Sequence, residues 1–322
     1  TRLILLICKK HHFMIKYKRK EVITMQIKNR KTNEIINTKD NLSLRFLYNT
    51  KLGNKTLKII IKPWFTKLSG TIMNSKISNI ITINLIKKYN IKKQEYEKQK
   101  FTSYNDFFTR KKKDKYLEID KNKNHLISPA DSKLTVYDIK ENSMFKIKDS
   151  YYSINELLNG DPISEQYKNG KILIFRLEPT DYHRYCYIDD GTKNENKYIK
   201  GIFHTVKNIA LKKYNIYKKN AREYTTLDTK NFGKVIQIEV GALIVGRIKN
   251  HHEEYQYKKG EEKGYFEFNG STIVLIFKKN KIEIDPDIKE NSNEKDNNKV
   301  FSGKSKDWWN KVGNSKEKVG KA

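Results

Sequence analysis

The chain lacks several features that would tie it to common protein classes. Its 322 residues include two cysteines, Cys8 and Cys186, which lie far apart and form no zinc-binding pattern. A disulfide framework is therefore not expected, and a reducing cytoplasmic compartment is the default. No apolar run reaches the length of a transmembrane helix, and residues 3–8 lack the cleavage site of a signal peptide. The sequence also contains no glycine-rich phosphate loop and no cluster of metal ligands.

Acidic residues are absent from one long stretch. Residues 41–94 contain no Asp or Glu but eleven Lys and Arg, and the whole chain carries a formal charge of +30. Such a charge attracts polyanions, and both nucleic acid and an anionic membrane fit it. Trp64, Leu68 and Ile72 recur at helical spacing after Pro63. Two interpretations stay open: amphipathic helices packed on their own domain, or helices lying on a membrane surface.

The remainder of the chain has β character. The segments 171–177, 235–248 and 271–277 are apolar and rich in β-branched residues, which predicts strands. We expect an α+β fold with a mostly antiparallel β core and the N-terminal amphipathic helices on one side. The expected domains are a loosely ordered basic arm (1–40, of which 1–13 precede the native start), one domain (41–290) and a disordered charged tail (291–322).

One stretch at the start of a predicted strand allows two interpretations. It reads Asn-Gly-Ser-Thr, from Asn269 to Thr272. Asn-Gly is a common hairpin dipeptide, so the stretch can be an ordinary turn that leads into a strand. Alternatively, the bond between Gly270 and Ser271 is one that the protein cuts itself.

Five motifs in order resemble the phosphatidylserine decarboxylases, closest to their clostridial-type bacterial members. They are YNDFFTR (104–110), SPADSKL (128–134), RLEPTDYHRYCYIDDG (176–191), FGKVIQIEVGALIVGRI (232–248) and KKGEEKGYFEFNGST (258–272). The resemblance runs from about Pro63 to Asp285. It implies a proenzyme in which Ser271 attacks the Gly270 carbonyl, which leaves a large chain ending at Gly270 and a small chain beginning at residue 271.

The resemblance also implies the chemistry that follows self-cleavage. Ser271 would become a covalent pyruvoyl cofactor that converts phosphatidylserine to phosphatidylethanolamine, with no metal. A lipid substrate implies an anionic membrane as partner and a peripheral location on the cytoplasmic face of the cell membrane. No nucleic-acid motif is present, so we do not expect nucleic acid as a partner. The oligomeric state is open, and a homodimer is one option.

The resemblance assigns roles residue by residue, with one departure. Asp131 matches the triad aspartate, and His183 matches the first histidine of the family motif; Cys186 stands where a second histidine is usual. Three outcomes stay open for the base: His183, which we favour, or His204 supplies it, or the chain cannot process itself. The last outcome would make the protein a non-enzymatic lipid-binding relative. Arg184 and Arg222 are weaker candidates for binding the substrate carboxylate or phosphate.

Overall fold

The structure is a computed structural model, and it describes most of the chain. The described residues are 25–29, 32, 34–38, 41–117, 119–147, 150–211, 213–243, 247–268, 271–293, 297–300 and 311–315. Gly270 and Asn269, which the sequence places at the cleavage position, lie outside them.

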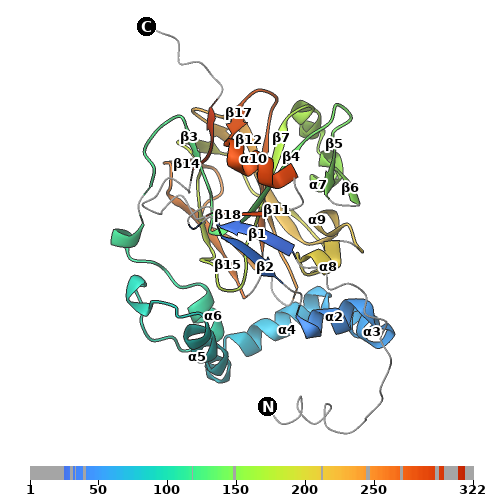
Figure 1. The fold of residues 1–322 in the computed structure, drawn as a ribbon, viewed down its shortest axis with the longest axis vertical. Helices are drawn as coiled ribbons and strands as arrows, with labels where there is room; N and C mark the ends of the chain where they lie inside the picture. The colour runs from blue at the N-terminus through green and yellow to red at the C-terminus, as the bar shows by residue number, and fades with distance from the viewer. Residues whose placement is uncertain are drawn as a thin grey trace.

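A row of helices follows the N-terminal strands and lies along one side of the molecule (Figure 1). The helices are α2 (Leu42–Asn49), α3 (Lys51–Ile60), α4 (Pro63–Met73), α5 (Asn79–Lys88) and the short α6 (Tyr104–Phe108). Thr50 caps α3 by accepting a hydrogen bond from the Gly53 N–H, and Pro63 occupies the first turn of α4. Within the described residues, no helix is long and apolar enough to cross a bilayer. We call α2–α5 the helical layer.

Helix α4 exposes its apolar side chains and buries small or polar ones, whereas α2 and α3 bury Tyr48 and Leu57 in the core. Trp64, Leu68 and Ile72 of α4 are 56%, 54% and 55% exposed. The opposite side of α4 buries Thr66, Ser69 and Gly70. The other exposed apolar side chains of the layer are Leu42, Phe46, Leu52, Ile59, Ile77, Ile80, Ile81 and Ile83. Among the described residues, Ile35 is the one exposed Leu, Ile, Phe or Trp that lies outside this layer.

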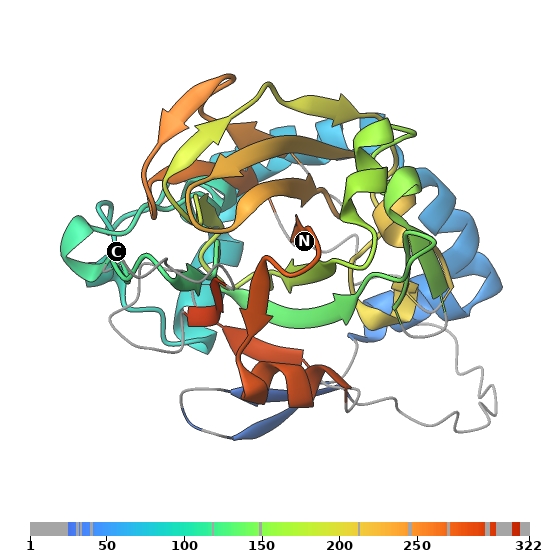
Figure 2. The ribbon, with the colours of Figure 1, turned by 90° about the horizontal axis from the view of Figure 1, so that it is seen from above.

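A large curved sheet forms the rest of the fold (Figure 2). Its central strands are β11 (Arg222–Thr229), β12 (Gly233–Val240), β16 (Thr272–Phe277), β7 (Lys171–Arg176) and β4 (Ser132–Asp138), in that order and all antiparallel. Every residue of β16 is buried, because this strand has covered faces on both sides. The predicted mostly antiparallel α+β fold with helices on one side is confirmed.

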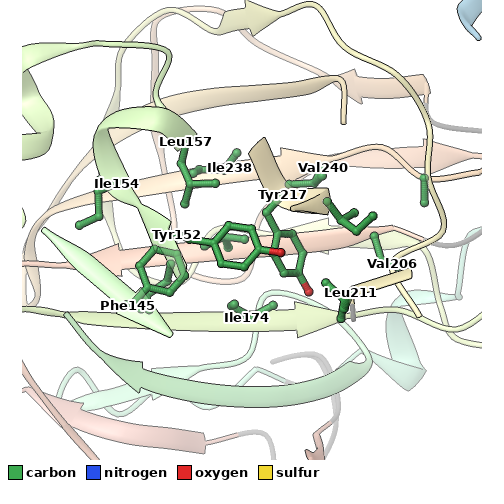
Figure 3. Packing of buried hydrophobic residues seen from close by; sticks show 14 of the residues in the cluster. Phe145, Tyr152, Ile154, Leu157, Ile174, Val206, Leu211, Tyr217, Ile238 and Val240 are labelled. Atoms are coloured by element: carbon green, nitrogen blue, oxygen red, sulfur yellow. The ribbon is translucent and has the colours of Figure 1, made fainter. Parts of the chain in front are cut away.

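The two faces of the sheet belong to separate apolar clusters. Val274 and Ile276 of β16 belong to the cluster on the first face. Figure 3 shows Tyr152 and Tyr217 of this cluster. Ile273, Leu275 and Phe277 pack on the second face, with Phe108 and Tyr185 among others. Because side chains alternate along a strand, odd-numbered residues of β16 point to the second face.

A second, smaller sheet covers part of the second face. It consists of β13 (Arg247–Asn250), β15 (Glu262–Glu267) and β8 (Arg184–Cys186). The prediction of one continuous strand over 235–248 is therefore wrong. The chain leaves the large sheet after Val240 and enters the small sheet at Arg247. Apolar periodicity could not reveal this change of sheet, since the apolar run continues to Ile248 although β12 pairs with β16 and β13 pairs with β15.

The remaining helices and strands complete the fold. They are β1 (Met25–Asn29), β2 (Ile35–Thr38), η2 (Lys76–Ser78), η3 (Lys93–Glu95), η4 (Asp114–Tyr116), β3 (His125–Ile127), β5 (Met144–Ile147), β6 (Ser150–Ser153), α7 (Ile154–Leu157), η5 (Pro162–Tyr167), β9 (Gly191–Lys193), β10 (Lys197–Ile199), α8 (Asn208–Leu211), α9 (Ile216–Lys219), β14 (Tyr255–Tyr257), β17 (Ile282–Ile284), α10 (Pro286–Asn293), β18 (Asn297–Val300) and β19 (Lys311–Ser315). Thus β1 and β2 lie in the predicted basic arm, and β18 and β19 lie in the predicted tail. The domain boundaries stay a prediction.

Candidate active site

Ser271 lies at the start of β16, in the middle of the large sheet. Its carbonyl accepts a hydrogen bond of 2.9 Å from the Leu177 N–H, which continues the pairing of β16 with β7 beyond Thr272 and Arg176. The Ser271 hydroxyl is buried and has no hydrogen-bond partner within the described residues. A buried polar group without a partner is costly, so such a group indicates a functional site. By strand alternation, the hydroxyl is on the second face of the sheet.

Phe268 enters the same segment in an unfavourable backbone conformation. Its φ is +75°, in the left-handed region that residues with a Cβ seldom adopt. The ring is buried against α4, where a Cβ on Gly70 would lie 3.3 Å from it. Strain of this kind is found at functional sites, where the surrounding structure holds it in place. Here it precedes the predicted cleavage position by two residues.

His183 is fully buried and has one free ring nitrogen. Its Nδ1 lies 2.9 Å from the Asp181 carbonyl oxygen, and its Nε2 has no partner within the described residues. Because a carbonyl oxygen can only accept, Nδ1 carries the proton and Nε2 carries a lone pair. Burial, and then the charge of Arg110, lower the pKa of His183 to about 3. The imidazole is therefore neutral at neutral pH and able to accept a proton.

Two backbone hydrogen bonds hold the His183 segment across the predicted cleavage position. On one side the Leu177 N–H binds the Ser271 carbonyl, and on the other the Phe266 N–H donates to the His183 carbonyl over 3.1 Å. Residues 177–183 are thus bound both to the residue that follows the cleavage position and to the strand that leads to it. His183 also packs against Phe108 of the second-face cluster, with the two rings tilted by 36°, on the face that carries the Ser271 hydroxyl.

His204 approaches the sheet from the first face. Its Nδ1 lies 3.0 Å from the Tyr48 hydroxyl, and its ring stacks on Tyr214 with centroids 4.4 Å apart. Burial, and then the charge of Lys219, lower the pKa of His204 to about 4. Asn220 joins the His204 carbonyl to the Gly241 carbonyl beyond the end of β12. His204 therefore lies near the same end of the sheet, but its ring belongs with the first-face cluster.

Asp131 and Cys186 lie beside the His183 segment. The Asp131 carboxylate lies 3.9 Å from the Lys112 ammonium. The backbone N–H of Lys112 donates a hydrogen bond of 3.3 Å to the hydroxyl of Tyr182, the residue before His183. The Cys186 N–H donates to the Pro129 carbonyl, and its thiol lies 3.9 Å from the Ser128 carbonyl. The fold thus brings the segments carrying Asp131, His183, Cys186 and Ser271 to one end of the sheet.

The two arginine candidates are both engaged with protein groups. Arg184 donates to the Thr109 carbonyl and pairs with Glu262 at 2.6 Å. Arg222 is buried and donates to four backbone contacts, the carbonyls of Leu157, Lys218, Asn220 and Glu156. These bonds give Arg222 a structural function, and a role of either arginine in substrate binding stays a prediction.

The sequence motifs did not single out every residue that contacts the site. Arg110 ends the YNDFFTR motif, yet its effect on His183 follows only from the fold. The one signal for Arg110 in the sequence was its position within the YNDFFTR motif. Among the described residues, no group of three or more His, Cys, Asp or Glu side chains could hold a metal ion.

Comparisons with known proteins give one consistent family. The family model described as phosphatidylserine decarboxylase matches residues 104–305. The chain is 51% identical over 273 residues to phosphatidylserine decarboxylase proenzyme 2 of Clostridium acetobutylicum, covering 84% of this chain and 94% of the relative. It is 43% identical over 282 residues to the phosphatidylserine decarboxylase proenzyme of Clostridium tetani, covering 85% and 95%. These matches confirm the resemblance that the motifs indicated.

Proposed function

The chain belongs to the phosphatidylserine decarboxylase family, and from this premise we propose that it cuts itself at Gly270–Ser271 and then decarboxylates phosphatidylserine to phosphatidylethanolamine. The observation that carries the proposal is a pair of buried groups, the Ser271 hydroxyl and His183 Nε2, that have no hydrogen-bond partner within the described residues. A serine hydroxyl needs a base to become a nucleophile, and a neutral imidazole with a free lone pair is such a base.

In the proposed self-cleavage, the Ser271 oxygen bonds to the Gly270 carbonyl carbon while its proton passes to His183 Nε2. The peptide C–N bond then breaks, the amine of residue 271 takes up the proton, and an ester joins the two parts. Loss of the Cα proton of residue 271 breaks its Cβ–O bond, which releases the Gly270 carboxylate and leaves dehydroalanine. Water converts this residue to a pyruvoyl group and ammonia.

The position of Ser271 suits a covalent group of this kind. The buried site excludes bulk water, and the Leu177 N–H holds the carbonyl of residue 271 in place. A pyruvoyl group at this position would supply the electron sink that decarboxylation of an amino-acid headgroup requires. β16 pairs with β12 and β7 on either side, so the small chain would stay within the sheet of the large chain after the cut.

We further propose that the helical layer lies on a membrane, at the cytoplasmic face of the cell membrane. Its exposed apolar side chains have no covering within the described residues, and the layer carries lysines without any acidic residue. Apolar groups at the acyl boundary and lysines at anionic headgroups are the pattern of an interfacial helix. The layer also contacts the candidate site, since Gly70 of α4 lies against Phe268. A homodimer remains a separate prediction.

A second candidate function rests on Cys186. A thiol stands where the family motif usually has a histidine, and burial suits it as a small apolar residue. If the second histidine were indispensable, the chain would remain intact and act as a non-enzymatic lipid-binding protein.

The intact mass of freshly purified protein tests the proposed function. We expect two chains, with the small chain beginning at a pyruvoyl group derived from Ser271 and reactive towards hydrazine. Ser271→Ala should leave a single chain, and His183→Ala should slow cleavage by about 10²-fold or more, as loss of a general base does. Matched His204→Ala protein should cleave normally. An uncut wild-type chain would favour the second function, and rapid cleavage in His183→Ala would exclude His183 as the base.

A further inference from the structure

Arg110 is a buried cation that the proposed mechanism does not use. It follows α6 by two residues and donates to the Phe107 carbonyl at 3.2 Å. Its other terminal nitrogen donates to the carbonyls of Thr180 at 3.0 Å and Asp181 at 3.3 Å. The guanidinium lies over the ring of Tyr96, 4.9 Å from the ring centroid, and over the ring of Phe107, 4.5 Å from its centroid. These hydrogen bonds and ring contacts hold the planar guanidinium of Arg110 in one orientation.

Arg110 and His183 bind the same carbonyl oxygen. The Asp181 carbonyl accepts from His183 Nδ1 as well as from Arg110. Two residues before Arg110, Phe108 packs against the imidazole, with centroids 3.8 Å apart and the rings tilted by 36°. One short segment therefore fixes the plane of the His183 ring through Phe108 and the position of its hydrogen-bond acceptor through Arg110.

Among the described residues, Arg110 is the charged side chain with a resolved effect on the pKa of His183. Tyr104 of α6, which packs on Phe108, stays neutral because burial raises its pKa to about 12. Asp181 presents its carbonyl to the ring, while its carboxylate accepts from the Glu178 N–H at 2.8 Å. From β15, Phe266 contributes a backbone N–H to the His183 carbonyl. The positive charge of Arg110 opposes a second proton on the imidazole.

We propose that Arg110 is a positioning residue for self-cleavage: by binding the Thr180 and Asp181 carbonyls, it fixes His183 as the Nδ1-protonated tautomer with Nε2 free. This inference rests on the proposed function, because it concerns the tautomer of His183, the base of the proposed self-cleavage. Arg110 itself touches neither Ser271 nor substrate in this account. Its effect passes through the Asp181 carbonyl and through its charge.

Nuclear magnetic resonance of the uncut precursor tests the inference without any catalytic readout. Ser271→Ala protein with ¹⁵N-labelled histidine keeps the chain whole, and His183→Gln identifies the His183 signals among the seven histidines. We expect one Nδ1-protonated neutral tautomer from pH 7.5 down to pH 4.5. Adding Arg110→Gln should give a mixture of tautomers and raise the His183 pKa by about one unit, because a nearby like charge is lost.

A second measurement follows cleavage of the active precursor during refolding, by the mass of the small chain. Arg110→Gln and Arg110→Lys should each slow cleavage about tenfold or more, since a misplaced base loses its alignment. Arg110→Lys keeps the charge, so its His183 pKa should stay near that of the parent while the tautomers still mix. Arg247→Gln is the matched control. It removes an exposed arginine paired with Glu267 and should change neither readout.

The two measurements separate failure of this inference from failure of the proposed function. Folded Arg110→Gln protein with the parent's tautomer and pKa at His183 would overturn the inference, whatever the cleavage rate. A wild-type chain that never cleaves would refute the proposed function, while the tautomer measurement would still decide the part played by Arg110. If Arg110→Gln does not fold, Arg110→Lys decides: mixed tautomers with slow cleavage support the inference, and parent-like behaviour in both overturns it.

Discussion

Helix α4 of the helical layer and strand β16 of the large sheet direct their apolar side chains in opposite ways. β16 buries all six of its residues between two apolar clusters, whereas α4 exposes Trp64, Leu68 and Ile72 and buries Thr66, Ser69 and Gly70. Removal of apolar surface from water is the main driving force of folding, so the sheet gains stability from its own sequence. The exposed apolar side chains of α4 gain no such stability in water, which is why we propose a membrane contact for them.

The largest expected effect on stability comes from breaking a buried ion pair inside the β core. Lys263 and Glu239 form a fully buried ion pair at 2.8 Å between the two sheets. Lys263→Met should lower the free energy of unfolding by about 3–5 kcal/mol, because it leaves the Glu239 carboxylate buried without its cation. Urea denaturation of the Ser271→Ala precursor measures this change.

The control for this prediction removes both charges. Lys263→Met combined with Glu239→Leu should regain most of the lost stability, since two apolar residues can replace a buried pair. A single Lys263→Met variant as stable as its parent would show that the pair does not hold the interior.

A smaller effect is expected from an equally drastic change on the helical layer. Trp64→Ser should alter the free energy of unfolding by no more than about 0.5 kcal/mol, as exposed positions usually do. Binding to vesicles with anionic lipid should fall about tenfold, because about 1.5 kcal/mol of apolar burial is lost. Co-sedimentation with vesicles measures the binding.

Tyr198→Ser provides the matched control for the Trp64 variant. Tyr198 is a comparably exposed aromatic residue, 58% exposed, but it lies on β10 outside the helical layer. Its replacement should leave vesicle binding unchanged. Equal losses in the two variants would contradict a membrane surface confined to α2–α5.

Acid should destabilise the folded protein through two buried histidines, His183 on the second face of the sheet and His204 on the first. The folded-state pKa is lowered to about 3 for His183 and to about 4 for His204, against about 6.5 in an unfolded chain. Below pH 6.5 the unfolded state therefore binds more protons, so stability falls as pH falls. Each histidine should contribute up to about 1.4 kcal/mol per pH unit between pH 6 and pH 4.5.

Urea denaturation of the Ser271→Ala precursor at several pH values measures this slope. His183→Gln and His204→Gln should each remove about half of the histidine contribution. An unchanged slope in both variants would mean that neither imidazole is kept neutral by the fold.

The smallest expected effect concerns a single lysine of the helical layer. Lys67→Gln on α4 should weaken binding to vesicles with anionic lipid about fivefold at low salt, since one lysine near such a surface contributes about 1 kcal/mol. The difference should disappear in 1 M salt, where charges are screened within about 3 Å. Lys279→Gln, exposed in the turn after β16, should bind like the parent at both salt concentrations.

Much of the fold and of the candidate site could be predicted from short segments. The apolar run at 272–277 became β16, and the helical spacing after Pro63 became α4. The motifs around Asp131, His183 and Ser271 were placed in one family by their order alone. The split of the predicted strand over 235–248 could not be foreseen, because the apolar run continues to Ile248 and strand pairing depends on segments far away in the chain.

The choice between His183 and His204 shows the same limit. Both histidines follow strand-like segments, and neither neighbouring sequence tells which face of the sheet the ring will meet. The structure places them on different faces, since His183 packs against Phe108 of the second face and His204 stacks on Tyr214, beside Tyr48 of the first. Only the first pairing shares a face with the Ser271 hydroxyl, by the alternation of β16.

The sequence by itself determined the family, the residue types available for chemistry and the strands that bury their side chains, because these depend on local pattern. Tertiary structure decided which side chains meet. It joined Arg110 to the Asp181 carbonyl and turned the apolar side of the helical layer outward. Contacts between residues far apart in the chain depend on how sheets and helices stack, and a linear pattern carries no record of that arrangement.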